Sequence, residues 1–182
     1  MNPYELAKEY GWKSIVAEHN SKEAVSFLHK IAPEIGVILG ARIISEQVIK
    51  CFSRGIINFH PGVLPENRGL DNLKWAIFKN IPQGVTTHFI DKNIDEGVLI
   101  KKDFVNVEND DSVYDINFKL LNLELKHLNS LLKNNFIVKS TKSLKSSYPS
   151  KKAVSDEIDN TILNNFFDYK VNYQKILDKY IN

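Results

Sequence analysis

The chain has 182 residues, 43% of them hydrophobic and 25% charged, so it is long enough for one domain with a sizeable core and too apolar to be disordered. The formal net charge of +2, with acidic and basic residues interleaved, gives no indication of a nucleic-acid partner or a membrane surface. One cysteine, Cys51, excludes a disulfide and a cysteine-cluster metal site, and with no signal-peptide pattern and no apolar run near the roughly 20 residues of a membrane helix, we expect a cytoplasmic protein.

Predicted helices and strands alternate along the first third of the chain. The first helix ends at Gly11, because glycine tolerates the left-handed conformation at a helix end, and the second begins after Ser21, whose side chain can cap it. The continuous apolar run at 35–40 is typical of a strand covered on both faces. The elements in order are a helix over 4–10, a strand over 14–17, a helix over 21–31, a strand over 35–40, a helix over 44–52 and a strand over 55–59. This alternation predicts an α/β fold with a mostly parallel sheet and helices on both of its faces.

The second half of the chain continues the pattern and then changes in composition. The predicted elements are a loop over 61–69, a helix over 71–79, strands over 85–90 and 98–100, and a long amphipathic helix from 111 to 132. Residues 139–152 are rich in serine and lysine, which is typical of a linker or an extended arm. The apolar residues between 156 and 181 require burial on the main domain or on a second subunit. We therefore predict a catalytic core over 1–138 and a C-terminal linker with a helical extension over 139–182.

Asn58 and His60 stand at the carboxyl end of a predicted parallel strand, where open α/β sheets place their active sites. Residues two positions apart in a strand project to the same face. An amide donor for a developing oxyanion beside an imidazole that moves protons suits reaction at a carbonyl group. The structural alternative is a histidine that caps the strand end, with Asn58 satisfying backbone groups of the loop.

Asp95 lies in a tight turn over 94–97, shortly after the strand that carries His88. From such a turn its carboxylate could reach His60, orient the imidazole and favour its charged form. The alternative is an ordinary turn aspartate before a glycine. His88 packs or hydrogen-bonds within the site in either case, and we assign it no catalytic step.

Six segments in this order closely resemble the catalytic core of the 10-formyltetrahydrofolate-dependent formyltransferases. They are 35–44 (IGVILGARII), 58–65 (NFHPGVLP), 68–69 (RG), 75–77 (WAI), 84–91 (GVTTHFID) and 94–97 (IDEG). The resemblance covers about 14–132 and implies the Rossmann-like core of that family. It also implies that Asn58, His60 and Asp95 are the catalytic residues. The substrate amine would attack the formyl carbon, Asn58 and protonated His60 would stabilise the oxyanion, and Asp95 would hold His60 and help to move the proton.

The same resemblance implies N10-formyltetrahydrofolate as the co-substrate. Its pterin end would lie against the backbone of Arg42 and Ile44 and against the loop that begins with Ile90 and Asp91. Backbone groups do much of that recognition, so the identity of the side chains tests it weakly. Arg42 could equally be an ordinary surface residue.

The motifs also bear on the acceptor amine. Leu64-Pro65, Arg68-Gly69 and Trp75 look more like the tRNA and sugar branches of the family than the purine branch. The closest likeness is to enzymes that formylate amino-deoxysugars on nucleoside diphosphates. The stretch 139–182 is too short for the C-terminal barrel of the tRNA enzymes. We therefore expect a nucleotide-linked amino sugar as acceptor and no nucleic acid. Trp75 would be a stacking surface or, more simply, part of the core.

The chain departs from the family at its front, where full-length members have an opening strand and a glycine-containing loop. An exposed sheet edge would then invite pairing with another chain, so we expect a homo-oligomer, such as a dimer. Several alternatives stay open: a methionyl-tRNA or glycinamide ribonucleotide formyltransferase, a formyltetrahydrofolate hydrolase, and a truncated, inactive folate-binding remnant. A metal hydrolase using His60, His88 and Asp95 is disfavoured, because the sequence has no close pair of ligands at helical spacing.

Overall fold

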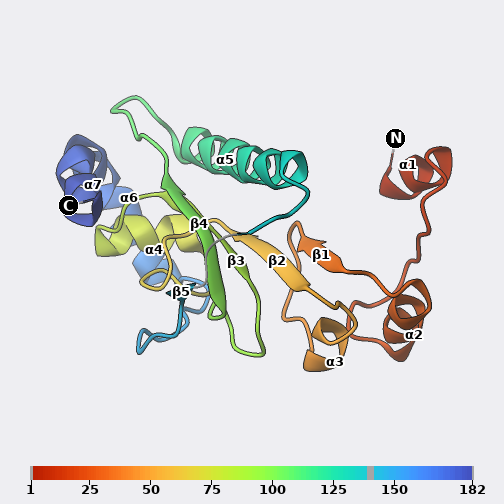
Figure 1. Ribbon diagram of the computed structural model, residues 1–182. Coiled ribbons are helices and arrows are strands. Elements are labelled where there is room, and N and C mark those ends of the chain that lie inside the picture. Colours follow the sequence, from red (N-terminus) through yellow and green to blue (C-terminus); the bar gives the residue numbers. More distant parts are fainter. Residues whose placement is uncertain (1, 139–141, 182) are drawn as a thin grey trace.

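The computed structural model describes residues 2–138 and 142–181, and in that part of the chain five strands form one sheet in the order β1-β2-β3-β4-β5 (Figure 1). The strands are β1 (Ile35–Ile38), β2 (Gly55–His60), β3 (Gly84–Phe89), β4 (Val98–Phe104) and β5 (Lys142–Ser143). The helices are α1 (Pro3–Glu9), α2 (Lys22–Ile31), α3 (Glu46–Ile49), α4 (Asn72–Lys79), α5 (Val113–Lys133), α6 (Asp156–Val171) and α7 (Tyr173–Ile181). The predicted α/β class is confirmed.

The directions of the strands differ from the prediction of a mostly parallel sheet, which is wrong. Among the described strands β1 and β2 run parallel, whereas β2–β3, β3–β4 and β4–β5 are antiparallel pairs. The prediction assumed that each helix between two strands crosses the sheet. After His60, however, the chain folds back through 61–71 and returns along α4, so that Thr86 near the start of β3 pairs with His60 at the end of β2.

Capping residues set several helix ends where the sequence predicts them. The Ser21 hydroxyl accepts a hydrogen bond from the backbone N–H of Ala24 at 3.1 Å and begins α2. Ser112 and Asp115 form a reciprocal capping box at the start of α5. Gly11 follows α1 with a φ of 65°. Local hydrogen bonding therefore explains these three boundaries.

Three predicted features near the front of the chain are wrong. Residues 14–17 form no strand, and the predicted helix over 44–52 is reduced to the four residues of α3. The strand over 35–40 was expected to be covered on both faces, but β1 lies at the edge of the sheet, where Val37 is 37% exposed and Leu39 beyond it is 63% exposed. Apolar composition alone predicted burial that the surrounding chain does not provide.

Helices cover both faces of the central strands, as predicted. α5 lies along one side of the sheet (Figure 1), where its Leu131 packs with Ile57 and Phe59 of β2. On the opposite face Ala76 of α4 packs with Val63 and Phe104. The larger core cluster joins α4, β3, α5, α6 and α7, and its buried members are Ile77, Val85, Val105, Val107, Ile116, Leu120, Leu123, Ile162, Tyr169, Tyr173 and Ile176.

Two buried tyrosines connect the last helices to the ends of the strands. The Tyr173 hydroxyl accepts from the backbone N–H of Gln83 at 2.9 Å and donates to the carbonyl oxygen of Val105 at 2.8 Å. The Tyr169 hydroxyl donates to the carbonyl oxygen of Ile81 at 2.8 Å. Burial raises the pKa of both phenols far above the usual value, so they stay protonated and keep donating.

The C-terminal part of the chain contributes to the sheet as well as to the core. β5 pairs with the start of β4, and residues 148–152 lie against the loop that follows β2. The division into 1–138 and 139–182, the oligomeric state and the cytoplasmic location stay predictions. In the described residues, every helix is too short or too polar to span a membrane.

Candidate active site

The register of β2 and β3 brings four polar side chains to one face of the sheet. Asn58 pairs with His88, and His60 pairs with Thr86. Because side chains alternate between the two faces of a strand, all four project to the face opposite α5. The loop after β2 and the turn after β3 fold over this face, which places the predicted site between two connections and the strands.

The imidazole of His60 lies between two oxygen acceptors. Its Nδ1 is 3.4 Å from Oδ1 of Asp95, and its Nε2 is 2.8 Å from the carbonyl oxygen of Asn67. Both ring nitrogens therefore face an oxygen acceptor, and the ring is held in one orientation by a loop on one side and a turn on the other. The ring is 4% exposed, and a side chain at position 62 would collide with it, because a Cβ built on Gly62 lies 2.8 Å from Nε2. The glycine is therefore needed for the close approach of the loop.

Asp95 takes its position from the tight turn that carries it. Its φ of 49° is in the left-handed region, and its Oδ2 accepts from the backbone N–H of Gly69 at 2.7 Å. The buried guanidinium of Arg68 donates to the carbonyl oxygen of Ile94 through both Nε and Nη2, and it forms an ion pair with Glu96 at 2.9 Å. The Arg68-Gly69 dipeptide thus holds the residues on either side of Asp95 as well as its carboxylate.

His88 orients the amide of Asn58. The Nδ1 of His88 lies 3.2 Å from the carbonyl oxygen of Phe89, and its Nε2 lies 3.4 Å from Nδ2 of Asn58. Burial lowers the pKa of His88 to about 4, with a further lowering by His60 that Asp95 opposes. The ring is therefore neutral at pH 7, with its proton on Nδ1 towards the carbonyl and Nε2 left to accept from the amide.

The three predicted catalytic residues, Asn58, His60 and Asp95, therefore lie together. Their catalytic role stays a prediction, because proximity alone also suits a structural polar cluster. Sequence reasoning missed the extent of the contacts of Arg68, which appeared only as part of a motif. It also missed Lys151, which lies in the predicted linker and contacts the loop before Arg68. For the contacts of Arg68, the one signal in the sequence is the pair of an arginine and a glycine in a loop.

The predicted folate-binding residues lie on two loops. In the loop after β1, Arg42 is exposed and Ile44 is half-buried, and Asn20 fixes the backbone between them through a bond to the carbonyl oxygen of Ile43 at 2.8 Å. In the turn after β3, the backbone N–H of Ile90 donates to Ile56 at 2.9 Å. The assignment of these residues to a pterin site stays a prediction.

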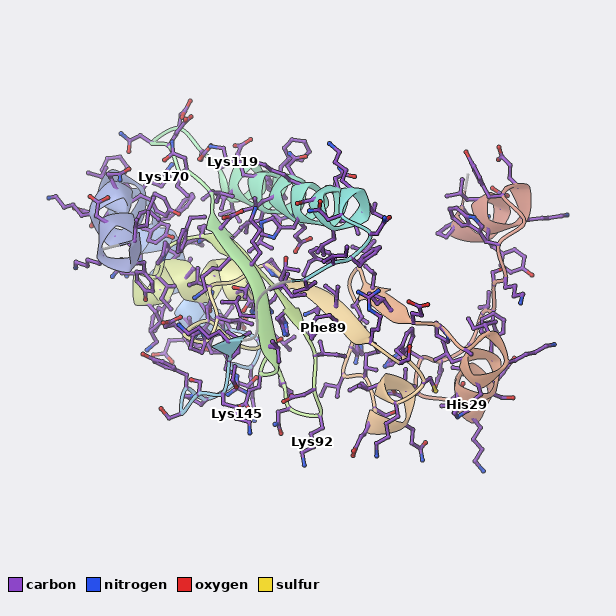
Figure 2. The ribbon with its side chains drawn as sticks, in the orientation of Figure 1. His29, Phe89, Lys92, Lys119, Lys145 and Lys170 are labelled. Carbon is purple, nitrogen blue, oxygen red and sulfur yellow. The ribbon has the colours of Figure 1, made fainter. Side chains whose placement is uncertain are left out.

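A lysine in the turn after β3 interacts electrostatically with the start of α3. The carboxylate of Asp91 accepts from the backbone N–H of Asn93 at 2.8 Å, which forms the turn that carries Lys92. The pKa of Glu46 at the start of α3 is lowered first by Lys50 and further by Lys92. Figure 2 shows Lys92 at the tip of its turn and Phe89 on the strand before it. The start of α3 and the turn after β3 are thus close enough to interact.

Trp75 packs instead of presenting a free stacking surface. Its indole N–H donates to the carbonyl oxygen of Lys152 at 2.8 Å, and its ring meets Phe78 edge-on with centroids 5.7 Å apart. This favours the simpler of the two interpretations of the tryptophan.

Comparison with known proteins gives consistent results. Residues 1–132 match the protein family described as formyl transferase. A methionyl-tRNA formyltransferase from Caldanaerobacter subterraneus subsp. tengcongensis is 32% identical over 71% of this chain and 43% of its own length. A GDP-perosamine N-formyltransferase from Brucella melitensis is 28% identical over 55% of this chain and 39% of its own length. The chain thus spans less than half of the length of these curated relatives.

Among solved structures, the formyltransferase PseJ from Anoxybacillus kamchatkensis superposes with a TM-score of 0.69 at 18% identity, over 97% of this chain and 94% of that one. It was crystallised with UDP-4,6-dideoxy-4-formamido-L-AltNAc and tetrahydrofolate. At this identity the likeness establishes a common fold.

Proposed function

The chain belongs to the formyl transferase family, and from that premise we propose that it transfers a formyl group from N10-formyltetrahydrofolate to an amine. The observation that carries the proposal is the arrangement of His60 between Asp95 and the Asn67 carbonyl, beside the oriented amide of Asn58. A relative with 32% identity, named as a formyltransferase, supports the same chemistry.

The proposed reaction uses the three side chains in distinct roles. The amine nitrogen attacks the formyl carbon and forms the new C–N bond, the bond from that carbon to N10 breaks, and the proton lost by the amine is taken up by N10. The amide of Asn58 has two N–H groups, and with one held by His88 the other donates to the formyl oxygen as it becomes negative. Protonated His60 donates to the same oxygen by exchanging its bond to Asn67 for the substrate. Asp95 supports the charge of the imidazole and assists the proton transfer.

We place the pterin of the co-substrate against the backbone of Arg42 and Ile44 and against Ile90 and Asp91. The side chains of Arg42 and Ile44 contribute little under this proposal, so replacement of either leaves the KM for the folate within about twofold, an effect under ~0.5 kcal/mol.

For the acceptor we propose a nucleotide-linked amino-deoxysugar. Support comes from the relative named as a GDP-perosamine N-formyltransferase and from the low net charge of +2, which gives little attraction for the phosphates of a nucleic acid. Methionyl-tRNA is the second candidate, because the relative with 32% identity is named for it.

An assay with a panel of acceptors tests the proposal. The purified chain is incubated with N10-formyltetrahydrofolate and one acceptor at a time: an amino-sugar nucleotide, methionyl-tRNA, glycinamide ribonucleotide, or water alone. We expect tetrahydrofolate to appear together with a formylated amino sugar. Formate release at an equal rate without an amine would establish a hydrolase instead. Binding of a folate analogue by calorimetry without turnover of any acceptor would overturn the enzymatic proposal and leave a folate-binding remnant.

A further inference from the structure

Lys151 belongs to the C-terminal segment, beyond the 1–132 region that matches the family. It nevertheless contacts several residues of the loop over 61–71 that follows β2. Its backbone N–H donates to the carbonyl oxygen of Arg68 at 2.9 Å, and its own carbonyl oxygen accepts from the N–H of Leu70 at 2.9 Å. Its ammonium group donates to the carbonyl oxygen of Glu66 at 2.6 Å and to Oδ1 of Asn67 at 3.2 Å.

Gly69 shows how closely the two segments approach each other. It forms a parallel bridge with Lys151, and a Cβ at position 69 would lie 2.1 Å from the carbonyl oxygen of Lys151. The φ of Gly69 is 101°, a conformation that other residues rarely adopt. The contact therefore depends on the absence of a side chain at this position.

The other side of the same loop holds the proposed catalytic pair. The Asn67 carbonyl accepts from Nε2 of His60, and the N–H of Gly69 donates to Asp95. Arg68 holds the turn around Asp95 and also donates to the carbonyl oxygen of Tyr148 at 2.9 Å. The loop is thus a single layer between the C-terminal segment and the two ionisable side chains.

Resting on the proposed function, we propose that Tyr148–Lys151 is a positioning segment for the active site, with Lys151 as the residue that fixes the loop carrying the His60 and Asp95 contacts. Its ammonium group binds the Glu66 carbonyl and the Asn67 side chain, and its backbone N–H binds the Arg68 carbonyl, so that the Asn67 carbonyl between them is held facing the imidazole. The side chain is half-buried, and burial, assisted by Lys79, lowers the pKa of its ammonium group. Such a buried cation needs the two oxygens that it contacts.

The test compares Lys151→Met with Lys152→Met, a matched control because Lys152 is exposed and adjacent. Two readouts are used: steady-state kinetics with both substrates, and the ¹⁵N imidazole signals of His60 in histidine-labelled protein. We expect Lys151→Met to lower kcat about tenfold with both KM values nearly unchanged, because small displacements of positioned groups slow the chemical step. The His60 Nε2 signal should shift in Lys151→Met and stay in place in Lys152→Met. Lys151→Arg, which keeps a donor, should recover most of kcat.

The outcomes separate this inference from the proposed function. If the wild type transfers formyl groups and the two methionine variants match it in kcat and in the His60 signal, the positioning role is wrong and the activity stands. If the wild type is inactive, the His60 signal alone decides the positioning role. If Lys151→Met does not fold, Lys151→Gln is measured in its place, and its kcat and His60 signal decide the positioning role.

Discussion

Two histidine–aspartate pairs lie on opposite faces of the same sheet and differ in the elements that hold them. On the face under α5, Nδ1 of His127 lies 2.7 Å from the Thr87 hydroxyl and Nε2 lies 2.9 Å from Asp103. On the other face, His60 stands 3.4 Å from Asp95. The first pair has two short contacts between regular elements, whereas the second depends on a loop and a turn.

The difference shows that residue types alone do not define a site. Thr87, His127 and Asp103 have the composition of a nucleophilic triad, but the threonine and the histidine are each 1% exposed and both ring nitrogens are occupied. His60 has a longer contact to its aspartate and a second contact that a substrate can replace. Catalytic hydrogen bonds are commonly long before the substrate binds. We interpret the His127–Asp103 pair as structural, because both nitrogens of its buried ring are held by regular elements, and the His60–Asp95 pair as chemical.

The largest expected effect is on turnover and comes from disruption of the His60–Asp95 pair. His60→Ala should lower formyl transfer about 10³-fold, because it removes both a donor to the oxyanion and the proton carrier. Because the ring is buried, the midpoint of urea unfolding is measured as well, and turnover is compared only for folded protein. Turnover is measured at saturating substrates, with Asp95→Ala in parallel. Wild-type-like turnover in His60→Ala would contradict the mechanism.

Disruption of the His127–Asp103 pair should lower stability and leave turnover nearly unchanged. His127→Ala should lower the free energy of unfolding by about 2 kcal/mol, because the Thr87 hydroxyl loses its partner and a cavity forms. Turnover of the folded protein should change less than threefold. The double variant Thr87→Val with His127→Leu should lose less stability than His127→Ala. A loss of turnover like that of His60→Ala would invalidate the distinction between the pairs.

His88 tests how far the site extends along β3. His88→Leu removes the acceptor for the Asn58 amide and should lower kcat about tenfold, while His88→Gln should be less affected because it keeps an acceptor. Kinetics of both variants against the wild type provide the check. Equal kcat values for leucine and glutamine would indicate that His88 fills space only.

The smallest expected effect is a dependence of stability on pH. Burial lowers the pKa of His88 to about 4 and also lowers that of His127, although Asp103 opposes the second shift. Between pH 6.5 and 4 the unfolded chain binds more protons at these rings than the folded chain does. The free energy of unfolding should therefore fall as the pH is lowered through this range. His127→Gln should flatten the decrease, and exposed His29→Gln should leave it unchanged; identical slopes in all three proteins would refute the assignment.

Much of the site could be predicted because its information is local. Asn58 and His60 share a strand face by their spacing alone, and the ordered motifs through Asp95 identified the third member. Ser21 predicted a helix start for the same reason, since a capping hydroxyl acts within three residues. The order of the motifs therefore predicted site residues where the fold keeps sequence neighbours close in space.

Features that depend on distant parts of the chain could not be predicted in this way. The antiparallel direction of β3 follows from how 61–71 folds back, which composition does not encode. Lys151 contacts residues more than eighty positions away, and its surroundings in sequence indicate only a linker. Residues 14–17 have the composition of a strand but lie beside no partner strand in the described sheet.

The Tyr173 hydroxyl has a consequence for how the chain is made. It supplies hydrogen bonds to backbone groups of Gln83 and Val105, at the ends of β3 and β4. On the ribosome those strands emerge well before the helix that begins at Tyr173. Until the last helix is released, these backbone groups must bond to water, because buried polar groups need partners. The sheet can therefore reach its final packing only after the helix that begins at Tyr173 has left the ribosome, and ribosome-bound intermediates that lack it should be open to proteases at these strand ends.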